Sequence, residues 1–170
     1  MSMTGQCLRI GFAMLAIISS ADAQVRHQAP PSEWRTFLVP EYGTQVEDPA
    51  GIFAPAGASE KGVGRRFHTP DGRAILSVYS QDNGKHDTPA SYLKDNLRVS
   101  QPKLDYERVT RTFFAVSMER DDLIYYSRCN FSGGPSGAIH CFDLVYPRAE
   151  KEAWDPVVTR ISLSLRPLEG

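Results

Sequence analysis

The stretch Ser127–Phe142, SRCNFSGGPSGAIHCF, decides the fold because a glycine-rich loop within it separates two β-type runs, each carrying a cysteine. The runs extend outward to Leu123–Phe131 and Ala138–Tyr146, and residues favouring strands dominate both. Antiparallel pairing that places Cys129 opposite Cys141 closes the loop within the glycine-rich segment. We therefore predict a β-hairpin with a disulfide between Cys129 and Cys141, and a closed loop of this size contributes about 3 kcal/mol in the chain-entropy estimate.

The same cysteines have two other interpretations, a metal centre and a redox-active dithiol. Zinc-binding cysteines usually occur as C-x₂₋₄-C pairs, whereas Cys129 and Cys141 have 11 residues between them. His140 directly precedes Cys141, so on a strand their side chains point to opposite faces. Exchange-active dithiols typically form a C-x-x-C motif at a helix N-terminus, which this segment does not contain. We expect no metal, cofactor or catalytic residue here.

Upstream of the hairpin, two further patterns extend the sheet. Tyr106–Met118 is strand-like and joins the hairpin across Glu119–Asp122, which predicts an antiparallel meander of three strands. Arg65–Thr69 and Ala74–Ser80 flank Pro70-Asp71-Gly72, residue types that form tight turns, so they predict a second hairpin. Neither face of the second run is fully polar, which indicates a sheet covered on both sides.

Helix signals occur after this second hairpin and at the C-terminus. Thr88 can accept hydrogen bonds as an N-cap and Pro89 suits the first helical position, so we predict a helix over Pro89–Arg98. The C-terminal segment fits both a helical stripe and a strand alternation, and its strong helix formers favour the helix. Because Pro156 cannot donate to the carbonyl of Glu152, we expect a kink there or a restart with Asp155 as cap.

The N-terminus has the features of a secretory signal peptide. Arg9 precedes an apolar run, and small residues lead up to the expected cleavage between Ala23 and Gln24, so 1–23 is expected to be removed. The alternative is that the segment is kept as a membrane anchor, which the run disfavours because it is far shorter than the roughly 20 apolar residues that span a bilayer. A polar lead-in over 24–33 then precedes a single domain over 34–170. Cleavage would leave 147 residues in the periplasm or outside the cell. No later apolar run is long enough to span a membrane.

Composition narrows the classes of partner. The 170 residues carry 19 basic and 20 acidic side chains, a net charge of −1 with neutral histidines, which gives no electrostatic reason to bind nucleic acid. Aromatic residues are frequent in the predicted meander, and most of them are expected to fill the core. A minority could line a ligand groove.

Three segments resemble the PsbP-like fold, which is shared by the photosystem subunit PsbP, a Ran-binding nuclear import factor and the periplasmic protein DcrB. They are Tyr42–Phe53 (YGTQVEDPAGIF), Thr88–Leu93 (TPASYL) and the ending from Tyr146 to Leu165. The chain is also similar to small secreted proteins of soil proteobacteria. The resemblance implies an α+β fold, a sandwich of helices packed on an antiparallel sheet, and action mainly by binding other proteins, with no shared catalytic motif.

Two functions from different classes follow from these observations. The first is a non-enzymatic periplasmic domain that binds another protein or an envelope component. The alternative is a periplasmic hydrolase or redox enzyme whose site is assembled from residues distant in the sequence. A concave pocket with converging titratable groups would favour the enzyme, and a flat apolar patch would favour binding.

Overall fold

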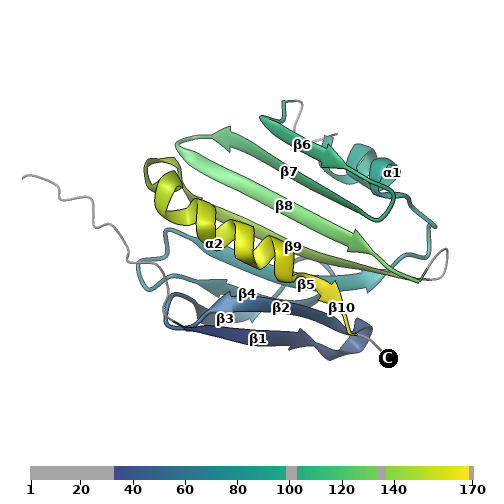
Figure 1. The fold of residues 1–170 in the computed structure, drawn as a ribbon, viewed down its shortest axis with the longest axis horizontal. Helices are drawn as coiled ribbons and strands as arrows, with labels where there is room; N and C mark the ends of the chain where they lie inside the picture. The colour runs from purple at the N-terminus through teal and green to yellow at the C-terminus, as the bar shows by residue number, and fades with distance from the viewer. Residues whose placement is uncertain (1–32, 99–102, 134–136, 169–170) are drawn as a thin grey trace, which may run out of the picture.

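The computed structural model describes residues 33–98, 103–133 and 137–168, which form two antiparallel sheets with helices packed on them (Figure 1). The smaller sheet has the order β1-β2-β10, and its strands are β1 (Trp34–Val39), β2 (Thr44–Pro49) and β10 (Arg166–Pro167). The larger sheet has the order β3-β4-β5-β9-β8-β7-β6. Its strands are β3 (Ala54–Ala58), β4 (Val63–His68), β5 (Ile75–Asp82), β6 (Tyr106–Val109), β7 (Phe113–Arg120), β8 (Leu123–Phe131) and β9 (Ala138–Pro147). The predicted α+β class is confirmed.

The hairpin of β8 and β9 lies in the middle of the larger sheet, in the predicted register. Cys129 is the direct partner of Cys141, and a disulfide joins them. β9 pairs on its other side with β5, so the hairpin links the two halves of the sheet. The predicted disulfide is therefore present, and it lies at the centre of the fold.

The prediction of one long strand over Tyr106–Met118 is wrong. The segment forms two strands, β6 and β7, which pair with each other around a turn at 110–112. Thr110 makes this turn: its hydroxyl accepts hydrogen bonds from the amides of Thr112 and Phe113 at 3.2 and 3.0 Å. The meander therefore has four strands, because a threonine hydroxyl supplies the turn that glycine or proline would otherwise signal.

The second predicted hairpin is confirmed as β4 and β5, with His68 opposite Ile75 across the turn. The two faces of β5 are covered by different parts of the molecule. Leu76 and Val78 pack in the cluster that contains the smaller sheet and the C-terminal helix α2 (Lys151–Ser164), whereas Tyr79 packs in a second cluster with the helix α1 (Pro89–Leu93). The prediction of a sheet covered on both sides is confirmed, although α1, on the second face, is a shorter helix than α2 on the first.

Two helices and three single-turn or π segments complete the described chain. They are η1 (Pro40–Tyr42), α1 (Pro89–Leu93), the π-helical η2 (Lys94–Arg98), η4 (Arg148–Glu150) and α2 (Lys151–Ser164). Thr88 caps α1 as predicted, since its side chain accepts from the Ser91 amide at 3.1 Å in a reciprocal capping box. Helical backbone then continues to Arg98, with π geometry in its second half.

The helix α2 lies across one face of the larger sheet and leads directly into β10 (Figure 1). It runs through Pro156 without a break, so the predicted restart with Asp155 as cap is wrong. Its buried stripe explains why: Trp154, Val157, Val158, Ile161 and Leu165 all pack in the main core. Burying such side chains contributes about 1.5–3 kcal/mol each, which outweighs the hydrogen bond lost at proline.

No helix in the described part of the chain is both long and apolar enough to cross a bilayer. The predicted signal segment over 1–23, its cleavage site at Ala23 and Gln24, and the lead-in over 24–32 lie outside the described residues. β1 begins at Trp34, the residue at which the sequence places the start of the domain.

Candidate functional site

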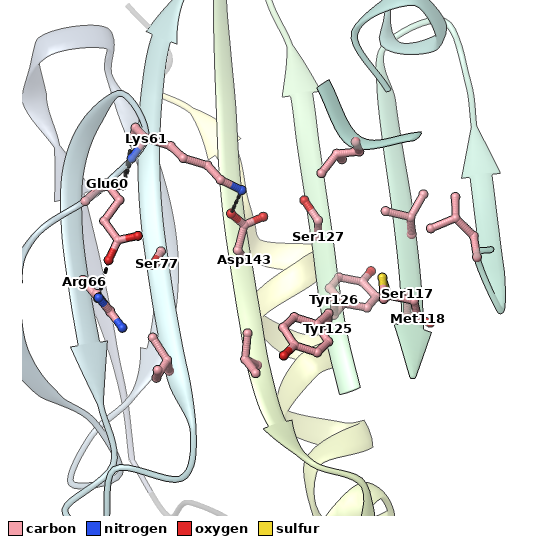
Figure 2. Close-up of a pocket in the computed structure, with 16 residues that line it drawn as sticks. Glu60, Lys61, Arg66, Ser77, Ser117, Met118, Tyr125, Tyr126, Ser127 and Asp143 are labelled. Atoms are coloured by element: carbon pink, nitrogen blue, oxygen red, sulfur yellow. Dashed lines mark hydrogen bonds and ion pairs between the residues drawn. The ribbon is translucent and has the colours of Figure 1, made fainter. Parts of the chain in front are cut away.

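The face of the larger sheet opposite α2 is covered only in part, because α1 and η2 together are ten residues long. Beside them lies an open hollow of about 220 Å³, which we call the sheet hollow (Figure 2). Its lining residues are Ser59, Glu60, Lys61, Arg66, Ile75, Ser77, Leu97, Leu104, Val116, Ser117, Met118, Tyr125, Tyr126, Ser127, Asp143 and Val145. In Figure 2 the hollow is seen face-on, with α2 behind the strands.

Strand register explains which side chains meet on the floor of the sheet hollow. Ser77, Asp143 and Ser127 are direct partners across β5, β9 and β8, and Val116 continues the row on β7. Directly opposite side chains on neighbouring strands have Cβ atoms roughly 4.5–5.5 Å apart. The floor therefore contains a polar row formed by residues that are up to 66 positions apart in the sequence.

The next row along the same strands is apolar. It contains Ile75, Val145, Tyr125 and Met118, which are successive partners on β5, β9, β8 and β7. Leu97 from η2 and Leu104 also line the hollow. The sheet hollow thus places a polar row directly beside an apolar surface.

Lys61 reaches into the hollow from the loop between β3 and β4. Its Nζ lies 2.8 Å from Oδ2 of Asp143 (Figure 2). The same Nζ lies 5.9 Å from the centre of the Tyr79 ring. Ser59 shapes this loop, since its hydroxyl donates to the Lys61 carbonyl at 2.7 Å and accepts from the Lys61 amide at 3.1 Å. A second ion pair, between Glu60 and Arg66, lies at the rim. The four charged side chains that line the hollow therefore form two internal pairs.

Two polar atoms of the floor have no hydrogen-bond partner among the described residues. They are the hydroxyl oxygen of Ser127 and Oδ1 of Asp143, and both are buried. The Ser127 residue as a whole is 9% exposed, and its hydroxyl lies beside the Asp143 carboxylate in Figure 2. A buried polar group without a partner costs about 1–3 kcal/mol, more when it is charged. These two atoms are the strongest evidence for a binding site in the described chain.

A second hollow, of about 340 Å³, continues beneath α1 and η2 and shares Lys61 and Leu97 with the first. Tyr79 and Tyr92 line it, and the Tyr92 hydroxyl accepts from the Gln81 amide nitrogen at 3.2 Å. Burial raises the pKa of both tyrosines, and the nearby Asp143 carboxylate raises that of Tyr79 further. Both phenols therefore remain protonated near neutral pH, as uncharged groups.

The disulfide lies beneath this second hollow, one row away from Ser127 and Asp143. Its half-cystines Cys129 and Cys141 are 1% and 0% exposed. Thiol exchange needs an accessible sulfur and a stabilised thiolate, and this burial offers neither. The disulfide acts as a structural link.

His140 occupies the opposite face of β9, as its position next to Cys141 predicts. It is completely buried, with Nδ1 2.7 Å from the Thr44 hydroxyl and Nε2 2.7 Å from the Ser132 hydroxyl. Burial lowers its pKa, so the neutral ring donates from one nitrogen and accepts at the other. These contacts tie β9 to β2 and hence join the two sheets. The sequence carries no signal for this contact, because Thr44 lies 96 residues away.

Other residues considered from the sequence have ordinary structural positions. Asp121 and Asp122 form the turn between β7 and β8 with φ values of 53° and 59°. Within 33–98, 103–133 and 137–168, no group of three or more His, Cys, Asp or Glu side chains is arranged to hold a metal ion. The sequence did not single out Ser127, Asp143 or Lys61.

Comparison with known proteins finds a match to the fold of this chain but none to its sequence. No protein-family profile and no curated protein matches the chain. The solution structure of cyanobacterial PsbP (CyanoP) from Synechocystis sp. PCC 6803 superimposes with a TM-score of 0.61 over 79% of this chain and 92% of that one, at 9% identity. The chain has a PsbP-like fold. A crystal structure from Bacteroides thetaiotaomicron VPI-5482 gives a TM-score of 0.47 at 13% identity, covering 79% of this chain and 48% of that one.

The fold predicted from the resemblance is thus confirmed, and at 9% identity the PsbP-like fold is all that this likeness establishes. Any function of the sheet hollow and its polar row has to follow from the chemistry of this chain's own residues.

Proposed function

We propose that the chain is a non-enzymatic binding domain of the periplasm, and that it binds a protein partner or an envelope component at the sheet hollow. The observation that carries the proposal is the pair of buried polar atoms without partners, on Ser127 and Asp143, on the floor of an open concavity. A bound group would supply the missing hydrogen bonds. Function by binding is also what the resemblance to the PsbP-like fold implies.

The chemistry of the lining favours binding over catalysis. Among the described residues that line the sheet hollow there is no histidine and no cysteine. The carboxylate of Asp143, whose side chain is 20% exposed, is held in an ion pair with Lys61, and the Ser127 hydroxyl is not hydrogen-bonded to a base among the described residues. Nucleophilic catalysis requires a nucleophile within hydrogen-bond reach of a base that a third group orients.

Export to the periplasm is the second part of the proposal, and it rests on the signal-like segment over 1–23. If that segment is removed between Ala23 and Gln24, the protein recovered from the periplasmic fraction should begin at Gln24. Intact-mass measurement of the fractionated protein tests this directly. A chain that keeps residues 1–23 and remains in the cytoplasmic fraction would contradict it.

Photo-crosslinking from single positions in living cells tests the site. A photoreactive residue in place of Glu60, whose side chain is 76% exposed at the rim of the hollow, should give adducts of defined mass. Glu152 on α2 is the matched control, because it is also an exposed glutamate but lies on the opposite side of the sheet. Adducts from position 152 alone, or from neither position, would contradict binding at the sheet hollow.

A hydrolase remains the second candidate because one pair, Ser132 and His140, has the hydrogen-bond geometry of a nucleophile and its base at 2.7 Å. The third member is the hydroxyl of Thr44, which cannot stabilise an imidazolium as a carboxylate does. Hydrolysis of p-nitrophenyl esters by the purified protein, and its loss in Ser132→Ala, would favour the enzyme. Equal turnover by both proteins would exclude this pair.

A further inference from the structure

We propose that the sheet hollow binds an uncharged amphipathic molecule whose polar head carries a hydrogen-bond donor beside an acceptor, as a carboxamide or a pair of hydroxyl groups does. The proposal rests on the proposed function in one respect, that the sheet hollow is the binding site. It adds the chemical class of the ligand, and three properties of the hollow determine that class.

The first property is the balance of charge. The charged side chains of the lining form two pairs, Lys61 with Asp143 and Glu60 with Arg66. A charged ligand on the floor would therefore lack a counter-ion unless it broke one of these pairs. Transferring an unpaired charge out of water is far less favourable than transferring a neutral polar group, so the hollow selects a neutral head.

The second property is the hydrogen-bonding capacity of the floor. Oδ2 of Asp143 already accepts from Lys61, and Oδ1 has no hydrogen-bond partner among the described residues, although the phenol of Tyr79 lies near the same carboxylate. Oδ1 can therefore accept from a ligand donor. The Ser127 hydroxyl can donate to a second ligand atom or accept from it. The two residues are direct cross-strand partners, so one small head group can contact both. A carboxamide would donate from its nitrogen to Asp143 and accept at its oxygen from Ser127.

The third property is the apolar row beside the polar one. Ile75, Val145, Tyr125 and Met118 extend along the strands next to Ser127 and Asp143. An aliphatic or flat aromatic group attached to the polar head would lie on this row, where it would leave water. The volume of about 220 Å³ is below the roughly 300–1,000 Å³ typical of pockets for drug-sized ligands, so the part that enters is small.

Three six-carbon probes of the same length test this class: hexanamide, hexylammonium and hexanoate, each titrated into the ¹⁵N-labelled protein near neutral pH. Hexanamide should shift the backbone amide signals of Ser77, Ser127, Asp143 and Val145 with saturation in the millimolar range. Hexylammonium and hexanoate should bind about tenfold more weakly or not at all, a difference of about 1.4 kcal/mol.

A matched pair of serine variants separates recognition from general loss of structure. Ser127 and Ser80 both have buried hydroxyls without partners among the described residues, but Ser80 lies on the face of β5 that packs toward α2. Ser127→Ala should weaken hexanamide binding about three- to tenfold, the effect of one lost hydrogen bond. Ser80→Ala should leave it unchanged.

Each outcome decides between the two proposals. Preference for hexylammonium would make Asp143 a cation site and overturn the neutral class, while binding at the sheet hollow would stand. If no probe shifts the hollow residues, or if both serine variants weaken binding equally, the ligand class is wrong even when crosslinks form from position 60. Absence of those crosslinks overturns the proposed function itself.

Discussion

Removing the disulfide should lower the free energy of unfolding by about 3 kcal/mol. Cys129 and Cys141 are 12 positions apart, and closing a loop of this length removes chain entropy from the unfolded state equivalent to about 3 kcal/mol at 25 °C. Native domains typically unfold with about 5–15 kcal/mol, so this one link would be a large share of the total. The variant with both cysteines replaced by alanine is the appropriate perturbation, because both sulfurs are buried and serine would bury two new hydroxyls.

Urea unfolding of the oxidised protein and of the double alanine variant measures this difference. With a slope of about 1–3 kcal/mol per molar urea for a domain of this kind, the midpoint should fall by about 1–3 M. A reductant supplies the internal control. It should lower the midpoint of the natural chain toward that of the variant, and it should not change the variant, because residues 24–170 contain no cysteine besides Cys129 and Cys141.

A loss well below 1 kcal/mol would refute the reasoning, because the entropic estimate assumes that strands β8 and β9 separate in the unfolded chain. In that case the unfolded ensemble would already hold the hairpin, and the disulfide would constrain nothing further. A loss far above 3 kcal/mol would also contradict it, since the sulfurs would then contribute mainly through packing in the cluster around Tyr79 and Phe114.

Two further predictions concern buried side chains. Burial lowers the pKa of His140, so below the ordinary value of about 6.5 the unfolded chain binds a proton that the folded chain does not. The free energy of unfolding should therefore fall as pH decreases from about 6.5 toward the folded pKa, by at most about 1.4 kcal/mol per pH unit. In His140→Gln the part of this pH dependence that comes from His140 should be absent when urea midpoints are compared at pH 7 and pH 5. Ile161→Ala, at a fully buried position of α2, should lower the free energy of unfolding by about 2–5 kcal/mol. Leu163→Ala, at a 76% exposed position of the same helix, should change it by no more than about 0.5 kcal/mol in the same assay. Similar losses in both variants would contradict the observed orientation of α2.

The sequence predicts those parts of the fold whose determinants are local. Pro70-Asp71-Gly72 marks the β4–β5 turn, and the threonine at 88 marks the start of α1, because the capping side chain acts within three residues. Where the local signal is weak, prediction failed. The turn at Thr110 contains neither glycine nor proline, and its stabilising hydroxyl can be recognised only once the neighbouring strands are known to pair.

Tertiary packing overrides the local signal at Pro156. The sequence correctly identifies a residue that removes a helical hydrogen bond, but it does not show how much apolar surface the same helix buries. The contact between His140 and Thr44 could not be predicted for the same reason, since it too is a result of tertiary packing. It depends on how the smaller sheet docks against the larger one, and residue spacing contains no information about that docking.

Part of the candidate site could have been predicted from the sequence, because the predicted disulfide fixes which residues face each other. Pairing Cys129 with Cys141 fixes the register of β8 and β9, and the same register places Ser127, two residues before Cys129, opposite Asp143, two residues after Cys141. Two polar residues facing each other on the face that buries the cystine form a pattern that the register alone reveals. The register does not reveal that Lys61 lies in the hollow. Lys61 binds Oδ2 of Asp143, and Oδ1 has no hydrogen-bond partner among the described residues.

This relation gives the disulfide a role beyond stability. A slip of one residue between β8 and β9 would turn Ser127 or Asp143 to the opposite face, because side chains alternate along a strand. The cystine excludes that slip from a position one row away, and it does so while both sulfurs remain buried and inert. The disulfide-bonded hairpin would therefore contribute to the proposed binding indirectly, since it fixes the row on which the proposed ligand would bind.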